Sequence, residues 1–352
     1  MDVERQRWLL TRYEDVLAAL RDDARFSADQ DDLASSMLVS DPPTHTRLRS
    51  LVSKAFTPRA VRTLTPRIEQ IVDELLDAAT RGSGMDVIAD LAYPLPITVI
   101  AELLGVDTDR RDFFRDVSQK VTVAMGPITD AAVAQRASEG RNQLVAYFDD
   151  HIARRRLDPR DDLVTALVQA EDGGDVLSHR ELIAMLLLLL IGGHETTVNL
   201  IANGLLALLR NPEQFELLRT TPSIAPRAVE ELLRFDAPVQ YSGRIAKADM
   251  ELAGRLIRAG EPVRLMLAAA NRDPEAFDDP DRLDLKRTPC AHLSFGMGIH
   301  SCLGAPLARI EAEIALPALI GRFPQMRLGA GELRYRPAAV LRGLEALPVT
   351  FH

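Results

Sequence analysis

The chain has 352 residues, of which 26% are charged and 47% are apolar, so its composition excludes a disordered or fibrous protein. Its formal net charge of −9 argues against a nucleic-acid-binding protein, because phosphate binding needs clustered Lys and Arg. The longest apolar run, Leu182–Ile191, is too short to span a bilayer, and the first residues carry charges of both signs. We therefore expect a cytoplasmic protein with no membrane span.

Helical spacing of apolar residues dominates the chain. It predicts helices at Tyr13–Arg21, His45–Phe56, Pro66–Arg81, Arg141–Arg156, Ser178–Arg210, Ile224–Arg234 and Leu303–Phe323. Short β-branched or alternating runs predict strands at Trp8–Thr11, Arg244–Ala246, Leu252–Ile257 and Val263–Leu267. Because no repeat, low-complexity tract or flexible linker marks a boundary, we expect residues 1–352 to form a single, mainly α domain with a minor β region.

The stretch Phe295–Gly304 has the pattern Phe-Gly-x-Gly-x-His-x-Cys-x-Gly and precedes a predicted helix. Backbone N–H groups at a helix start stabilise a thiolate and lower its pKa, which makes Cys302 a candidate ligand. Taken alone, Cys302 would be expected to be a buried, inert thiol, which is the usual state of a free cysteine. A dinucleotide site is excluded because the stretch lacks the third glycine of G-x-G-x-x-G. With Cys290 as the second cysteine, the chain has too few for a disulfide framework or an iron–sulfur cluster.

The helix predicted from Ser178 opens with a capping-box pattern, Ser178 followed by Glu181. It is apolar on all sides, which is typical of a helix buried at the centre of a fold. Polar residues nevertheless interrupt it at Gly192–Thr197. The pair His194-Glu195 suggests a zinc protease, but Val198 stands where that motif requires a second histidine. As ordinary helix residues, Thr196 would bond a carbonyl one turn back and Glu195 would face a solvated groove.

Two further patterns place charged residues on one helix face. Glu231 and Arg234 are three residues apart, which suits an ion pair. His45 and Arg49 are four apart, so both can bind one anion. Each pattern by itself also fits a solvated surface helix, where such pairs contribute little to stability.

Together these motifs resemble those of the bacterial cytochromes P-450, from about Thr11 to the C-terminus. Phe295–Gly304 matches the cysteine-ligand loop of that family at every defining position, and Gly192–Thr197 is similar to its oxygen-binding groove. The resemblance implies the cytochrome P-450 fold, with haem b between the central long helix and the cysteine-ligand loop. Usual members begin earlier and have a longer segment between Phe26 and Asp41, so the roof of the substrate pocket departs from the family pattern.

The resemblance implies a role for each of the residues singled out above. Cys302 would be the axial thiolate of the haem iron. Thr196 would donate a hydrogen bond to dioxygen, and Glu195 would help to deliver protons. His194 falls at a variable position, so we expect a packed or partly exposed helix residue. The other haem contacts would come from His45, Arg49, Arg244, Phe295, Gly296, His300 and Gly304.

Within that set, Phe295 would shield the sulfur, and His45, Arg49, Arg244 and His300 would converge on the two haem propionates. A separate network of Glu231, Arg234 and Arg282 would have a structural role. Arg282 is assigned because the segment Pro280–Leu283 resembles the one that supplies the second arginine of this network in the family.

The implied activity is a haem-thiolate monooxygenase that uses dioxygen to hydroxylate or otherwise oxidise a small organic substrate. Electrons would come from an external ferredoxin and its reductase, because the chain has neither a flavin motif nor enough cysteines for a cluster. One alternative is a peroxygenase using hydrogen peroxide, which would not need the acid–alcohol pair Glu195–Thr196. Another is a catalytically silent haem-fold module that recruits partners, which we would expect to lose the ligand loop or the oxygen groove.

Overall fold

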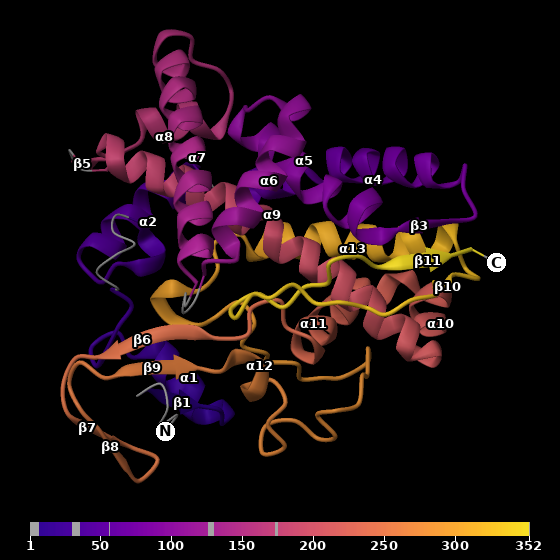
Figure 1. Ribbon diagram of the computed structural model, residues 1–352. Coiled ribbons are helices and arrows are strands. Elements are labelled where there is room, and N and C mark those ends of the chain that lie inside the picture. The colour runs from indigo at the N-terminus through magenta and orange to yellow at the C-terminus, as the bar shows by residue number, and fades with distance from the viewer. Residues whose placement is uncertain (1–6, 30–35, 56, 126–129, 173–174, 352) are drawn as a thin grey trace.

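The computed structural model describes residues 7–29, 36–55, 57–125, 130–172 and 175–351 (Figure 1). Residues 30–35, in the segment expected to help roof the substrate pocket, and Phe56, the last residue of one predicted helix, lie outside these ranges. The α-helices α1 to α13 are, in order, Tyr13–Arg21, Thr44–Ala55, Pro58–Thr63, Thr65–Ala79, Pro94–Leu104, Arg111–Thr122, Ala131–Leu157, Leu163–Gln169, His179–Arg210, Pro212–Thr220, Ala225–Phe235, Leu267–Ala270 and Ala305–Arg322.

Short helical turns and strands complete the described structure. The turns η1 to η5 are Met37–Val39, Ile88–Ala92, Thr108–Arg110, Pro222–Ile224 and Gly298–His300. The strands β1 to β11 are Trp8–Leu10, Phe26–Ser27, Gly84–Asp86, Glu171–Asp172, Asp175–Val176, Ser242–Ala246, Met250–Leu252, Arg255–Ile257, Pro262–Leu265, Arg327–Leu328 and Pro348–Thr350.

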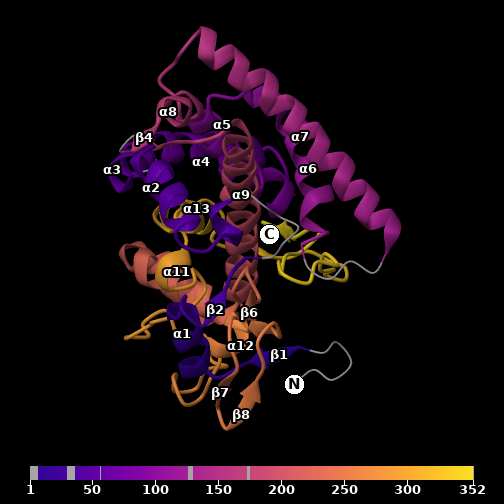
Figure 2. The ribbon, with the colours of Figure 1, turned by 90° about the vertical axis from the view of Figure 1, so that its left-hand side faces the viewer.

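The central element is α9, which runs through the helical body and packs against α5, α7, α11 and α13 (Figure 2). The predicted capping box begins it: the Ser178 hydroxyl accepts from the backbone N–H of Glu181, whose carboxylate accepts from the N–H of Ser178. Length and composition alone would let α9 cross a membrane, but 56% of its most apolar window is buried inside the protein. Its apolar surface is therefore used as the core of the fold.

A four-stranded sheet, in the order β1-β9-β6-β2, lies beside α1 and α12, apart from the helical body (Figure 1). Strand β1 pairs in parallel with β9, whereas β6 pairs antiparallel with both β9 and β2. Buried residues of α1 and β9, among them Val16 and Val263, join a second, smaller hydrophobic core here. The larger core surrounds α9.

Most predicted elements are present, with some changes at their ends. The helix predicted from Arg141 begins ten residues earlier as α7, at Ala131, because the Asp130 side chain caps it by accepting from the N–H of Ala132. The strand predicted at Leu252–Ile257 is wrong. A tight turn at Ala253 and Gly254, both with positive φ, divides it between β7 and β8.

Candidate active site

A short loop carries Cys302 to the start of α13. Gly296 and Gly298 have φ angles of 64° and 73°, in the left-handed region that favours glycine. A Cβ at Gly298 would also lie 2.5 Å from the carbonyl oxygen of Leu20 on α1, so this position requires glycine. The loop folds back on itself because the N–H of Cys302 donates to the carbonyl of Phe295 at 2.8 Å.

The surroundings of the Cys302 thiol act on it in opposite directions. Its side chain has accessible surface, yet protein surrounds it closely enough for burial to raise its pKa. The N–H groups of Gly304 and Ala305 and the charge of Arg49 oppose this rise without overcoming it. The expectation that the helix start lowers this pKa is therefore wrong for the net shift, because burial outweighs the N–H groups. Helix α13 also begins at Ala305, slightly later than predicted.

Four donors predicted to bind an anion lie together beside the loop. The rings of His45 and His300 are 4.4 Å apart between centroids. Burial, followed by the charges of Arg244, His45 and Arg49, lowers the pKa of His300 to about 4. Burial also lowers the pKa of each of the two arginines. The structure thus concentrates groups whose positive charge would be stabilised by an anion.

His45 shows that this cluster is suited to a ligand. The residue is 3% exposed, and neither ring nitrogen forms a hydrogen bond within the described part of the chain, although the backbone of Ile299 lies nearby. A buried polar atom left without a partner is costly. Arg244 is similarly buried and spends one nitrogen, Nη1, on its neighbours Ser242 and Gly243. Two carboxylates, such as the propionates of a haem, would satisfy this donor set.

The ring of Phe295 lies at the other side of the loop, close to α13. Its centroid is 4.5 Å from the guanidinium carbon of Arg309 and 5.8 Å from the ring of His292. Its predicted role in shielding the sulfur of Cys302 stays a prediction, because these contacts involve other side chains.

Between its exposed ends, α9 carries a stripe of accessible or partly accessible residues at four-residue spacing, Ala184, Leu188, Gly192 and Thr196, with Leu187 and Gly193 partly accessible beside it. A Cβ on Gly192 would meet no atom within 4 Å, so open space lies beside the middle of this core helix. Thr196 faces the same side, and its hydroxyl donates to the carbonyl of Gly192 at 2.9 Å. Core helices are normally close-packed, so an accessible stripe here indicates room for a bound molecule.

Glu195 does not face a solvated groove. Its side chain is 2% exposed, and its Oε2 accepts from Nη1 of Arg336 at 3.0 Å. Burial acts to raise its pKa, but His194 and Arg336 outweigh burial and lower it. Arg336 escaped the sequence analysis because it lies in an irregular segment near the C-terminus that has no motif around it.

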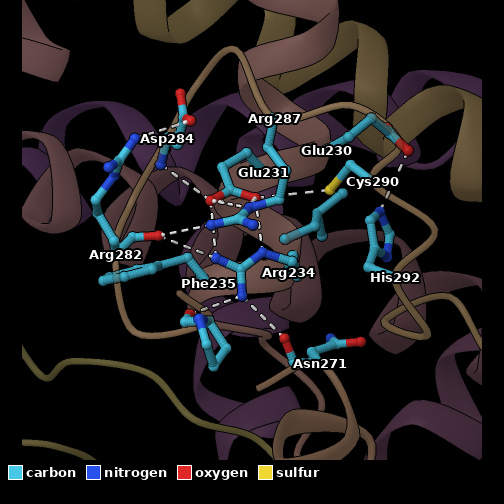
Figure 3. A network of polar contacts seen from close by, with 12 residues as sticks. Glu230, Glu231, Arg234, Phe235, Asn271, Arg282, Asp284, Arg287, Cys290 and His292 are labelled. Atoms are coloured by element: carbon cyan, nitrogen blue, oxygen red, sulfur yellow. Dashed lines mark hydrogen bonds and ion pairs between the residues drawn. The ribbon is translucent and has the colours of Figure 1, made fainter. Parts of the chain in front are cut away.

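Glu231 and Arg234 form the ion pair that their spacing suggests. Both side chains are fully buried, and the guanidinium donates to the two carboxylate oxygens at 2.7 and 2.8 Å. The guanidinium also donates to the carbonyls of Asn271 and Pro280, at 2.9 and 2.8 Å (Figure 3). These bonds satisfy both charges without water.

The assignment of Arg282 as the second arginine of this network is wrong. Arg287 takes that place, with its Nε 3.2 and 3.1 Å from the two carboxylate oxygens of Glu231. The side chain of Arg282 is 67% exposed and pairs with Asp284, whereas its backbone carbonyl points inward and accepts from Arg234 and Arg287 (Figure 3). The chain turns here, so the backbone rather than the side chain of residue 282 enters the network.

The network is tied to the segment that leads into the cysteine loop. Asn271, whose carbonyl accepts from Arg234, receives the N–H of Leu293 on its side-chain oxygen at 2.7 Å. Its amide donates to the Ser294 hydroxyl, which in turn donates to the carbonyl of Leu233 on α11. The buried charges therefore fix the position of the residues directly before Phe295.

The chain is similar to known proteins over nearly its whole length. The family model described as Cytochrome P450 matches residues 4–220 and 224–328. Cytochrome P450 107B1 of Saccharopolyspora erythraea is 46% identical, with 97% of this chain and 88% of that protein covered. Vitamin D(3) 25-hydroxylase of Pseudonocardia autotrophica is 44% identical, with 97% and 87% covered. The crystal structure of CYP109E1 from Bacillus megaterium with testosterone superposes with a TM-score of 0.95 at 38% identity, covering 100% of this chain and 94% of that one.

These matches cover nearly the whole chain, and their sequence identities are high enough to show a shared family as well as a shared fold. They confirm the predicted fold class and oxidoreductase activity, and the family implies a haem cofactor, small organic substrates and redox partners. The chain therefore belongs to the cytochrome P450 family and is a haem-dependent monooxygenase.

Proposed function

We propose that the cofactor is haem b and that Cys302 is its iron ligand. The observation that carries this proposal is the buried donor set beside Cys302, in which His45 has two nitrogens without a hydrogen-bond partner within the described residues. Arg49 is close enough to influence the pKa of both Cys302 and His300, so the donors and the thiol belong to one site. Together with Arg244, these donors would hold the propionates.

When bound, haem supplies the redox-active iron at which dioxygen is activated. Side chains of the central helix would handle the hydrogen bonds and protons of the reaction. The hydroxyl of Thr196 lies on the accessible stripe, and rotation about its Cβ–Oγ bond would redirect its hydrogen from Gly192 towards that space. Glu195, the next residue, would hold and release protons from its buried carboxylate.

We propose an apolar substrate whose hydroxylation or related oxidation is the reaction. The accessible stripe offers it aliphatic surface, from Ala184 and Leu188, beside the polar groups of Gly192 and Thr196. A similar hydroxylase is named for vitamin D(3), and a similar structure holds testosterone. Testosterone is therefore a suitable first probe of the pocket.

We further propose that electrons come from a separate ferredoxin and its reductase, that the enzyme works in the cytoplasm, and that the chain is one domain. With two cysteines it cannot build a four-cysteine cluster of its own. Support for one domain comes from strand pairing: β1 near the N-terminus pairs with β9, and β11 near the C-terminus pairs with β3. Each end of the chain thus pairs with a strand that is distant in the sequence.

The absorption spectrum of the reduced protein under carbon monoxide tests the iron ligand. We expect a strongly red-shifted Soret band, which reports an iron–thiolate bond. Cys302→Ser should abolish that shift. Cys290→Ser is the matched control and should retain the shift. Cys290 donates a hydrogen bond from its thiol to Glu231, and a serine hydroxyl can donate in its place. An unshifted band in the parent protein, or loss of the shift in the control alone, would overturn the assignment.

A further inference from the structure

His194 is a buried residue of α9, and the function proposed above gives its side chain no role. It is 0% exposed, and its Nδ1 lies 2.6 Å from the carbonyl oxygen of Leu190, one turn earlier. A carbonyl oxygen only accepts hydrogen bonds, so Nδ1 carries a hydrogen. The tautomer of this ring is thereby fixed by the helix.

The other ring nitrogen faces the carboxylate of Glu195. Nε2 lies 3.5 Å from Oε1, and neither of these two atoms has another hydrogen-bond partner within the described residues. Because Nδ1 already carries a hydrogen, Nε2 carries one only when the ring is an imidazolium. Without a further proton, a nitrogen lone pair would face a carboxylate in a buried site, which is unfavourable. One proton shared between Nε2 of His194 and Oε1 of Glu195 gives both atoms a partner.

The groups around the pair support one shared proton rather than two. Oε2 of Glu195 accepts from Arg336, which favours the ionised carboxylate. From the start of α5, the edge of the Tyr93 ring packs on His194, with centroids 5.9 Å apart. Burial raises the pKa of this tyrosine, and its hydroxyl donates to the carbonyl of Arg111, so it stays neutral. On α13, Glu311 lies next to Thr197, and burial raises its pKa, which favours its neutral form.

Solvent reaches the far side of Tyr93. A cleft of about 560 Å³ is lined by Tyr93 together with Asp112 and Arg115 of α6, and the guanidinium of Arg115 lies over the tyrosine ring. Water in this cleft is therefore one side chain away from His194. A movement of the Tyr93 ring would let a proton pass between the cleft and the histidine.

We propose that His194 is a positioning residue that stores the proton which Glu195 gives to the reaction. This rests on the proposed role of Glu195 in proton delivery. The Nε2–H bond of the imidazolium breaks, its electron pair remains on the nitrogen, and an O–H bond forms at Oε1. The pair has zero net charge before and after the transfer, which keeps the cost of moving the proton low in a buried site. Water from the cleft then reprotonates the ring.

Nitrogen-15 NMR of the haem-loaded protein in its diamagnetic ferrous carbon monoxide form tests the shared proton directly. His194→Gln identifies the signals of this ring. We expect both ring nitrogens to carry a hydrogen in the parent, and the Nε2 hydrogen to be absent in Glu195→Gln, because the carboxylate that faces it is gone. An unprotonated Nδ1, or an Nε2 hydrogen that Glu195→Gln leaves unchanged, would overturn the proposal.

Turnover tests the use of that proton. With NADPH, a ferredoxin, its reductase and testosterone as the probe, we expect the share of electrons released as hydrogen peroxide to rise in His194→Gln, and product to fall about tenfold. We expect coupling in the parent to decline as the pH rises, and this decline should be absent in His194→Gln, whereas a purely structural role would leave it in place. If Glu195→Gln lowers coupling and His194→Gln does not, this proposal fails alone. If neither variant changes coupling, the proton-delivery role of Glu195 fails as well.

Discussion

The hydroxyl of Thr196 has two possible partners, the carbonyl of Gly192 and a molecule in the space beside α9. It now donates to Gly192 at 2.9 Å. A hydroxyl has one hydrogen but two lone pairs, so it can turn its hydrogen to a ligand and leave the helix bonds intact. Its loss should therefore affect chemistry much more than folding.

We predict that Thr196→Ala keeps its haem but couples poorly. Product formed per NADPH should fall about tenfold, with the lost electrons appearing as hydrogen peroxide, because the donor that steadies the reacting oxygen is gone. Thr196→Ser retains the hydroxyl and is the matched control. Coupled turnover in the alanine variant equal to that of the parent would contradict the role given to this residue.

Glu311 is a buried acidic residue whose surroundings disfavour its charged form. Its side chain is 0% exposed on α13, and neither carboxyl oxygen forms a hydrogen bond of good geometry within the described residues, although Thr197 is close. Burial raises its pKa well above the ordinary value of 4.5, so the folded protein holds this proton more tightly than the unfolded chain does. Binding of this proton therefore stabilises the folded protein fully at a pH below 4.5, the ordinary pKa of Glu. This stabilisation is lost as the pH rises through the higher pKa of Glu311 in the folded protein.

We therefore predict that Glu311→Gln makes unfolding less sensitive to alkaline pH. Glutamine has nearly the same size but cannot ionise, so the variant should unfold at a higher urea concentration than the parent at pH 8 and at a similar one at pH 4. The exposed Glu332→Gln should change neither midpoint. If Glu311→Gln were less stable than the parent at pH 8, the charged form of Glu311 would be stabilising the folded protein, and the prediction would be wrong.

The sequence singles out candidate residues of the site but does not predict what surrounds them. Cys302 and the acid–alcohol pair stand out because short motifs fix their spacing. The environment of Glu195 could not be predicted, because its partner Arg336 lies 141 positions away in irregular chain. The same limit explains the wrong assignment of Arg282: several arginines lie close together in this part of the chain, and only the turn of the backbone decides that Arg287 points inward.

At the scale of elements, the buried network of Glu231 holds α11 to the chain before the cysteine loop. Glu231 binds Arg234 on its own helix and Arg287 from the distant segment. Removing one partner of a buried ion pair leaves an uncompensated charge, which costs far more than losing a surface pair. The side chain of Arg287 is largely buried, whereas that of Arg282 is exposed. Substituting each in turn therefore separates the effect of the buried network from that of a surface charge.

We predict that Arg287→Ala lowers the free energy of unfolding by about 3 kcal/mol and reduces haem content. Arg282→Ala should change stability by less than about 0.5 kcal/mol, because its side chain is exposed and only its backbone carbonyl enters the network. Urea unfolding and haem absorbance per protein measure both effects. Equal losses in the two variants would restore Arg282 to the network.

Among the elements, long amphipathic or fully apolar helices were the easiest to predict. Both ends of α1 are where the spacing places them, and α9 differs from its prediction only by its cap residue. The hairpin of β7 and β8 was missed, because the alternating pattern continues through its turn. An alanine with a φ of 50° at Ala253 gives no warning of that turn in the sequence.

At the scale of the whole molecule, the cysteine loop joins the two hydrophobic cores. Leu293 and Met297 pack against the smaller core beside the sheet, whereas Phe295 and Leu303 pack against the larger core around α9. The turn η5 within the loop also contacts α1. The loop is therefore held at both ends, and the donor cluster of α2, β6 and the loop lies at this junction.

We predict that removing haem loosens this junction while the helical core stays folded. Without the anionic partners, the positive charges of Arg49 and Arg244 would be left partly or fully buried without a counter-ion, which is unfavourable. Backbone hydrogen exchange should therefore become faster in α2 and in Phe295–Gly304 of the haem-free protein. The buried second half of α9 should keep its protection, because side chains of α11 and α13 cover it at Gly204. Uniformly faster exchange across α9 would instead show that haem is required for the helical core itself to form.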